Sequence, residues 1–253
     1  MPLKGRVALI TGASGGIGSA VARRCAEQGM HIAAHYHQNA DKAALLADDI
    51  RKTGVEALPV PADLTDPEAV AVMIDTVQHH LGSIDLLVNN AMLSHEFDAL
   101  TQPCFEQVAW EDYRRQFEGA AKTAYLCCQT VLPDMKKRRS GSIVCILTNL
   151  IFTPEVAYHA YTTAKASLIG FSRTLAAEAG PWGITVNMIA PGLIAGTGMS
   201  GHHTPDTLEQ VAHRTPMRRV GRPEDVADAV LFFASSTFVT GVCLVVDGGL
   251  TMH

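Results

Sequence analysis

Short apolar runs alternate along this chain with longer segments in which apolar residues recur every three or four positions. Runs this short are typical of buried strands, and the longer spacing is typical of helices that bury one face. Strands that alternate with helices pair in parallel, because each helix carries the chain back across the sheet. The sequence therefore predicts an α/β fold with a doubly wound, seven-stranded parallel sheet and helices on both faces. The expected strands are residues 7–10, 32–35, 57–60, 84–88, 143–147, 185–189 and 243–246.

The composition indicates one globular domain over residues 1–253 and argues against several classes of protein. Of all residues, 47% are hydrophobic and 18% are charged, and neither a repeat nor a linker interrupts the pattern. The formal net charge is -5 and the only basic run, 136–139, is short, so we expect no nucleic-acid partner. Serines, threonines and a glycine interrupt the uncharged stretch 229–246, so we expect no membrane span, and the amino terminus lacks the pattern of an export signal.

Six cysteines are scattered along the chain without C-x-x-C spacing, which argues against both a disulfide framework and a zinc site. His202 and His203 are adjacent, but no third candidate ligand lies near them in the sequence, so we expect no metal. Unpaired thiols are typical of a reducing compartment, and we therefore predict a cytoplasmic location.

A glycine-rich turn, "TGASGGIG" at 11–18, follows the first expected strand and opens a helix. Glycines allow a tight turn and a close approach of the backbone to a pyrophosphate, while the first N–H groups of the helix favour an anion. This context predicts a dinucleotide site, although a glycine turn without a ligand is the alternative. The candidate cofactor contacts here are Gly12, Ser14, Gly15, Gly16, Ile17 and Gly18.

Two tyrosines precede one lysine in "YHAYTTAK", at 158–165. On a helix, Tyr158 and Tyr161 would both share a face with Lys165, but they would lie about 10.5 Å and about 6 Å from it along the helix axis. A phenol is a weak acid, and a nearby ammonium favours its ionised form, so we expect Lys165 to lower the pKa of Tyr161. Packing of both side chains in a helix without any chemistry is the alternative.

Five motifs together resemble the classical short-chain dehydrogenase/reductase family, over essentially the whole chain. They are the glycine turn, "NNA" at 89–91, Y-x-x-x-K at 161–165, "PG" at 191–192 and a terminal "VDGG" at 246–249. The resemblance implies a Rossmann-type fold and an enzyme that transfers hydride between a nicotinamide cofactor and a carbonyl or alcohol. It also implies a homotetramer, assembled through helices near 106–137 and 158–179.

The same resemblance assigns roles to single residues. Tyr161 and Lys165 would be catalytic, and Thr148 would stand where the family usually has a serine that holds the substrate oxygen. Tyr158, Met92 and Leu193 would line the substrate pocket, next to a lid rich in Gly, Thr and His. Further cofactor contacts would be Asp63, Leu64, Asn90, Ala91, Lys165, Pro191, Gly192 and Ile194.

The segment after the second expected strand, "HYHQN" at 35–39, bears on the choice of cofactor. An NAD site usually has a carboxylate there to hold the ribose diol, and this chain has none. The segment resembles that of pteridine-reductase-like members, which makes His35, His37, Gln38 and Asn39 candidate contacts of a 2'-phosphate. We therefore expect NADP rather than NAD, with a solvated polar turn as the alternative.

Two positions depart from the family pattern. Met92 replaces the glycine of NNAG, and Ala120 stands where an asparagine normally bends a helix and anchors a water for proton relay. We expect alanine to do neither, which would slow turnover or require another path for protons.

The main hypothesis is a 3-oxoacyl-reductase-like or ketone reductase; the alternatives are a pteridine or enoyl reductase, and a cofactor-binding protein with little catalysis.

Overall fold

The computed structural model describes residues 2–92, 102–198 and 204–252, and it confirms the predicted fold. Seven parallel strands form one sheet in the order β3-β2-β1-β4-β5-β6-β7. The observed ends differ from the predicted ones by two residues at most. The strands are β1 (Val7–Ile10), β2 (His31–Tyr36), β3 (Ala57–Pro61), β4 (Ile84–Asn89), β5 (Gly141–Ile146), β6 (Ile184–Pro191) and β7 (Cys243–Val246).

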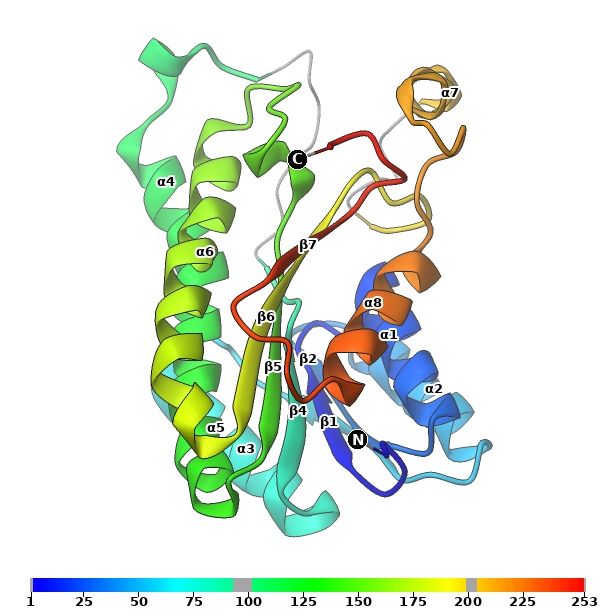
Figure 1. Cartoon of the computed structure of the whole chain (residues 1–253), viewed down its shortest axis with the longest axis vertical. Coiled ribbons are helices and arrows are strands. Elements are labelled where there is room, and N and C mark those ends of the chain that lie inside the picture. The colour runs from blue at the N-terminus through cyan, green and yellow to red at the C-terminus, as the bar shows by residue number, and fades with distance from the viewer. Residues whose placement is uncertain (1, 93–101, 199–203, 253) are drawn as a thin grey trace.

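Helices cover both faces of this sheet (Figure 1). One face carries α1 (Gly16–Glu27), α2 (Ala40–Arg51) and α8 (Pro223–Ser235). The other carries α3 (Pro67–Leu81), α4 (Trp110–Phe117), α5 (Thr123–Arg138) and α6 (His159–Ala179). A further helix, α7 (Pro205–Arg214), stands beyond the carboxyl ends of the strands, and the short 3-10 turns are Phe105–Gln107, Asn149–Ile151 and Gly180–Trp182.

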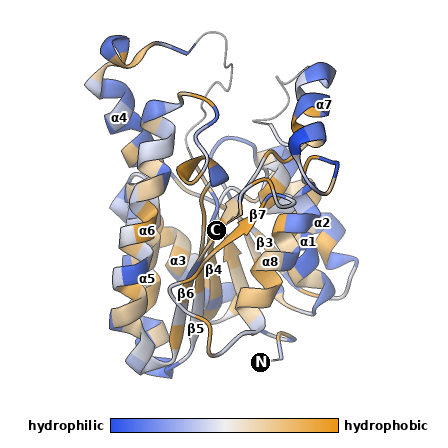
Figure 2. Ribbon diagram, turned by 45° about the horizontal axis from the view of Figure 1, so that its top comes forward, coloured by the Kyte–Doolittle hydropathy of each residue, from blue (hydrophilic) through white to orange (hydrophobic). Residues whose placement is uncertain are grey.

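Each face of the sheet has its own hydrophobic core, because successive side chains of a strand point to opposite sides. In β1, Val7 and Leu9 pack in one core, whereas Ala8 and Ile10 pack in the other. In Figure 2 the strands carry mainly hydrophobic colour, while α4 and α7, at the carboxyl ends of the strands, are mainly hydrophilic. Burial on both faces explains why the strands read as unbroken apolar runs.

The direction of winding reverses between β1 and β4, which are neighbours in the sheet although two strands separate them in the chain. The loops that leave these two strands run to opposite faces, and a crevice opens between them at the carboxyl ends. The glycine turn follows β1 and the "NNA" motif ends β4, so both border this crevice.

The helix that carries Ala120 does contain an irregular turn, so the expectation that alanine could not produce one is wrong. A π-helical turn, Glu118–Lys122, joins α4 to α5, and such turns are places where helices kink. The buried hydroxyl of Thr123 donates to the carbonyl oxygens of Gly119 and Ala120, at 3.0 and 3.2 Å. A threonine one turn away, rather than an asparagine side chain, thus satisfies the backbone at this turn.

Two adjacent phenylalanines of α8 allow a matched test of the core. Phe233 is fully buried between α8 and the sheet, whereas Phe232 is 51% exposed. Phe233→Ala should lower the free energy of unfolding by about 3–5 kcal/mol, through lost burial and a remaining cavity. Phe232→Ala should cost less than about 1 kcal/mol. Urea denaturation of both variants checks this, and equal losses would contradict the packing described.

Candidate active site

The turn between β1 and α1 is built for close approach of a ligand to the backbone. Gly12 has φ +65°, where side chains are strained, and a Cβ there would lie 3.1 Å from the Cα of Ala91. A Cβ on Gly18 would overlap the carbonyl oxygen of Gly12 and lie 2.9 Å from the Cα of Ala13. No side chain caps the start of α1, where Gly15 is the N-cap residue, so its first N–H groups suit an anion.

Hydrogen bonds fix this turn to the end of β4. The Thr11 hydroxyl donates to the carbonyl oxygen of Val88 at 3.1 Å and accepts from the N–H groups of Asn90 and Ala91, both at 2.9 Å. The Asn90 amide donates back to the carbonyl oxygen of Thr11 at 2.9 Å. The structure therefore brings Asn90 and Ala91 against the glycine turn, with the Asn90 side chain acting as a brace.

His35 has a different role from the predicted contact with a 2'-phosphate. Its side chain is 2% exposed, and both ring nitrogens contact the backbone: Nδ1 accepts from Gly12 N–H at 3.0 Å, and Nε2 lies 3.1 Å from the carbonyl oxygen of Ala62. This pairing requires a neutral ring with its proton on Nε2. Burial lowers the pKa of His35 to about 4. His35 therefore supports the glycine turn from behind.

The other candidates for this end of the site lie on its surface. His37, Gln38 and Asn39 are exposed after β2. Asp63 follows β3 and accepts hydrogen bonds from the backbone N–H and hydroxyl of Thr65, which lower its pKa, with smaller contributions from the charges of His37 and Lys122. Leu64 beside it is buried.

Lys122 was not predicted from the sequence. It comes from the π-helical turn, more than fifty residues after Asp63, and only the packing of the helices places its charge near the end of β3.

Thr148, Tyr161 and Lys165 are brought together at the carboxyl end of β5, and each is 6% exposed or less. Thr148 follows β5, while Tyr161 and Lys165 lie one turn apart near the start of α6. The Thr148 hydroxyl hydrogen-bonds with the Tyr161 phenol. The Lys165 ammonium donates to the carbonyl oxygen of Ile146 at 2.7 Å. The three residues thus form one buried polar cluster that spans a strand end and a helix.

Burial, rather than Lys165, controls the ionisation of Tyr161. Burial raises the pKa of Tyr161 to about 12, and the bond from Thr148 offsets only part of this. The net shift of the Tyr161 pKa is therefore upward, whereas the sequence predicted a downward shift caused by Lys165. Burial also lowers the pKa of Lys165 to about 8. At neutral pH, Tyr161 is a neutral phenol that can donate a proton, and Lys165 remains mostly charged.

Tyr158 is buried at the N-cap of α6 and lies close enough to affect the pKa of Tyr161. Met92 and Leu193 are half-buried, whereas Pro191 and Ile194 are buried, with Gly192 between them. A Cβ on Gly16 would lie 2.9 Å from the Cα of Thr197, so the segment after β6 passes directly over the glycine turn. His202 and His203 of the expected lid lie outside the described residues.

Asn149 and Asp247 support the site, and neither was predicted to do so. The Asp247 carboxylate accepts from the Asn149 amide at 3.1 Å and from the Thr251 N–H at 2.9 Å. A Cβ on Gly192 would approach the Cβ of Asp247 to 2.7 Å. The carboxyl-terminal segment is thereby tied both to the neighbour of Thr148 and to the segment after β6.

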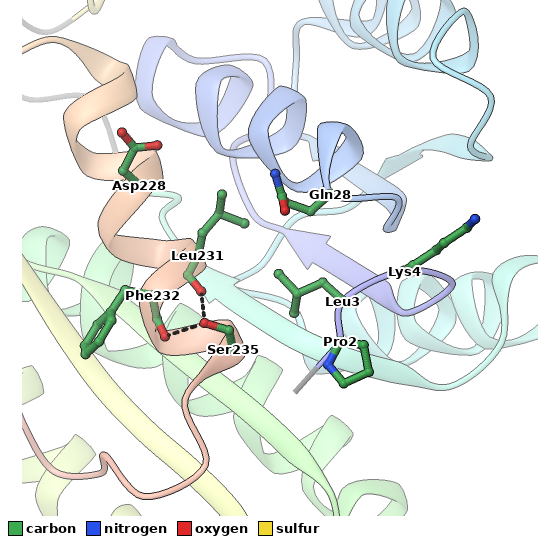
Figure 3. Close-up of a pocket in the computed structure, with 8 residues that line it drawn as sticks. All are labelled: Pro2, Leu3, Lys4, Gln28, Asp228, Leu231, Phe232 and Ser235. Atoms are coloured by element: carbon green, nitrogen blue, oxygen red, sulfur yellow. Dashed lines mark hydrogen bonds between the residues drawn. The ribbon is translucent and has the colours of Figure 1, made fainter.

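A second hollow in the described part of the chain lies away from the site residues described so far. A pocket of about 470 Å³ between the amino terminus, α1 and α8 lies at the opposite end of the strands (Figure 3). Its Asp228 pairs with Arg24, and its Ser235 donates to backbone carbonyls. Within residues 2–92, 102–198 and 204–252, no cluster of potential metal ligands is found, and none of the helices is long and apolar enough to cross a membrane.

Comparison with known proteins agrees with this geometry. A family model described as "Enoyl-(Acyl carrier protein) reductase" matches residues 12–251. The chain is 35% identical to a 3-oxoacyl-(acyl-carrier-protein) reductase of Staphylococcus epidermidis, over 97% of this chain and 98% of that protein. The chain belongs to the classical short-chain dehydrogenase/reductase family.

Solved structures of a short-chain dehydrogenase/reductase and of a hydroxysteroid dehydrogenase share the fold over nearly their whole length. A mutant Serratia marcescens enzyme of the family superposes with a TM-score of 0.87 at 28% identity and covers all of both chains. A 7α-hydroxysteroid dehydrogenase, solved with NADH and a 7-oxo bile acid, superposes with a TM-score of 0.88 at 32% identity. The match covers 98% of this chain and 94% of that one. The chain is thus an oxidoreductase of the short-chain dehydrogenase/reductase family.

Acidification should destabilise the fold through His35. Its pKa of about 4 lies below the ordinary value of 6.5, so between these values the unfolded chain binds a proton that the folded chain excludes. The free energy of unfolding should therefore decrease as the pH falls through this range, by up to roughly 1.4 kcal/mol per pH unit. His35→Gln keeps a donor and an acceptor and should remove this contribution.

The matched control is His80→Gln, at an exposed position near the end of α3 and away from His35, which should leave the pH dependence as it is. Urea denaturation at several values from about pH 7 to about pH 4.5 measures the slopes. Equal slopes in the original protein and in His35→Gln would refute the role given to this histidine.

Proposed function

We propose that this enzyme reduces the ketone of 3-oxoacyl thioesters with NADPH. The observation that carries the proposal is the buried cluster of Tyr161, Thr148 and Lys165, in which a neutral phenol is hydrogen-bonded to a hydroxyl beside a lysine. The name of the Staphylococcus epidermidis relative, and that of a 34% identical Synechocystis protein, 3-oxoacyl-(acyl-carrier-protein) reductase, support the substrate class.

Each residue of this cluster has a different role in the reduction of a ketone. When bound, the nicotinamide supplies the hydride. Tyr161 donates a proton to the carbonyl oxygen, since burial keeps its phenol neutral. Thr148 orients the same oxygen through its hydroxyl, and the charge of Lys165 stabilises the phenolate that proton transfer leaves behind.

Proton return to Tyr161 needs a route that does not use an amide at position 120. The π-helical turn is present without that amide, and the Lys165 ammonium is held by the carbonyl oxygen of Ile146. The side chain of Tyr158 is a second phenol close to that of Tyr161. We therefore propose that Tyr158 or solvent at the pocket takes part in returning the proton.

The glycine turn fits the pyrophosphate of a dinucleotide, since Gly12, Gly16 and Gly18 leave no room for side chains and the start of α1 is uncapped. For the 2'-phosphate, we propose His37, Gln38, Asn39 and Lys122 as contacts. No carboxylate occupies the end of β2 to favour the ribose diol of NAD. Lys122 replaces His35 in this proposed set.

Two rival functions have specific support. An enoyl reductase is favoured by the description of the matching family model and by Tyr158, which has the longer spacing to Lys165. A cofactor-binding protein with slow chemistry is favoured by Met92 beside the turn and by Ala120. A pteridine reductase, a weaker third candidate, is favoured by the "HYH" segment and by the two tyrosines, while Thr148 and the burial of His35 count against it.

We also propose one domain over residues 1–253, because both cores pack on a single sheet.

A homotetramer is proposed from the family resemblance, and the exposed side chains of Phe105 and Trp110 near α6 are compatible with it. The mass in solution, measured by light scattering, tests the tetramer. Six cysteines without disulfides support a reducing compartment such as the cytoplasm.

Removal of one phenol separates the ketone reductase from the enoyl reductase. Tyr161→Phe should reduce kcat on acetoacetyl-CoA by about 10²-fold or more, because the proton donor is lost, while the Kd for NADPH stays nearly unchanged. Tyr158→Phe is the comparison variant: it should mainly change KM if solvent returns the proton, and should lower kcat less than Tyr161→Phe if Tyr158 takes part. The opposite pattern, or consumption of NADPH with crotonyl-CoA but not with acetoacetyl-CoA, would assign the enzyme to enoyl reduction.

Cofactor preference can be measured without turnover. NADPH should bind more tightly than NADH by about 1–3 kcal/mol, from charged hydrogen bonds to the 2'-phosphate. Lys122→Gln should weaken only NADPH, and Tyr36→Asp, which adds a carboxylate at the end of β2, should shift preference toward NADH. Calorimetric titration of each variant with each cofactor checks this; equal affinities of the original protein would exclude the preference.

A further inference from the structure

An ion pair joins α7 to the segment that precedes α6. The two terminal nitrogens of Arg214, Nη1 and Nη2, donate to the two carboxylate oxygens of Glu155 at 2.8 and 2.9 Å. These residues are 59 positions apart in the chain. The two-pronged arrangement is specific to a guanidinium and a carboxylate, since a lysine cannot make both contacts at once. We call this pair the Arg214–Glu155 clasp.

The remaining attachments of α7 are few. None of its residues is fully buried, and in Figure 2 the helix is mainly hydrophilic. At its carboxyl end the chain is anchored by Thr215, which is buried, and by the bond from Met217 N–H to the carbonyl oxygen of Gly248 at 3.2 Å. A helix with so little buried area depends on individual polar contacts for its position.

The two ends of the clasp belong to opposite sides of the candidate active site. Glu155 lies between Thr148 and Tyr158, on the segment that connects the end of β5 to α6. Arg214 ends the helix that follows the segment leaving β6, and Figure 1 shows α7 and the start of α6 at the same end of the sheet. The clasp therefore spans the region between the segment carrying Tyr158 and α7.

We propose that Arg214 and Glu155 are positioning residues that hold α7 as the outer wall of the substrate pocket. This inference rests on the proposed function for the location of that pocket. Neither side chain acts on the reacting atoms; the pair determines where α7 stands relative to Tyr158. Substrate affinity therefore depends on the clasp, whereas the chemical step and cofactor binding at the glycine turn do not.

The test compares Arg214→Gln and Glu155→Gln with the original full-length protein. Each variant should raise KM for acetoacetyl-CoA roughly two- to fivefold, the effect of losing an exposed ion pair, with kcat changed less than about twofold and the Kd for NADPH unchanged. The double variant Glu155→Arg with Arg214→Glu should restore most of the KM. High salt should raise KM of the original protein toward that of the variants, since salt screens the pair.

Arg219→Gln is the matched control. Arg219 makes a similar two-pronged pair with Asp225, at 2.6 and 2.8 Å, but that pair lies at the start of α8 and does not bridge the pocket. This variant should leave KM unchanged. A rise in KM equal to that of Arg214→Gln would overturn the proposal, because any loss of surface charge would then suffice.

Amide hydrogen exchange gives a readout that does not need activity. Exchange in residues 205–214 should become faster in Arg214→Gln and Glu155→Gln, and slow again in the double variant. Unchanged exchange would overturn the clasp even if KM rises. Absence of any ketone reduction by the original protein would instead refute the proposed function, and the exchange result would then decide the clasp alone.

Discussion

The hydrogen bonds between the β1–α1 turn and the end of β4 are the contacts on which the site depends. The Thr11 hydroxyl accepts hydrogen bonds from two backbone N–H groups at the end of β4, and the Asn90 side-chain amide donates a hydrogen bond to the turn. They lie where the winding of the sheet reverses, so the loops on either side diverge and would otherwise be free to move apart. With these bonds formed, Ala91 packs against Gly12, and the floor of the crevice is held together by contacts within the protein.

Burial shifts the pKa values of two titratable groups of the candidate active site in opposite directions. It raises the pKa of Tyr161 and lowers that of Lys165, because a low-dielectric setting disfavours the charged form of each. The phenol therefore retains its proton at neutral pH, and the ammonium keeps its charge with a backbone carbonyl as partner. The same cause makes His35 a fixed neutral acceptor rather than a cation. One physical effect thus keeps Tyr161 and His35 neutral, whereas Lys165 stays charged in spite of it.

The fold was predictable from the sequence because the two patterns that indicate it each lie within a short stretch of chain. Apolar runs mark the strands, and the glycine turn after β1 identifies the first crossover. The candidates Tyr161 and Lys165 came from a short motif and Thr148 from its spacing to Tyr161, and the structure brings the three together. Errors arose where a residue's role depends on tertiary packing. His35 is buried against the backbone of Gly12 and Ala62, which contact its two ring nitrogens. At the turn near Ala120, the hydroxyl of Thr123 donates to a backbone carbonyl oxygen. Lys122 and the pair of Arg214 with Glu155 had no local signal, because their partners come from distant segments.

The close approach of Gly16 to Thr197 constrains how this chain can vary. A Cβ on Gly16 would meet the Cα of Thr197 at 2.9 Å and the carbonyl oxygen of Gly196 at 3.0 Å, both backbone atoms of a segment about 180 residues away. A larger residue at position 16 therefore cannot be accepted by changing one side chain in reply; the backbone of the crossing segment has to move. An engineer who transplants this glycine turn into another scaffold would need to transplant residues 194–198 with it, since the backbones of the two segments fit against each other.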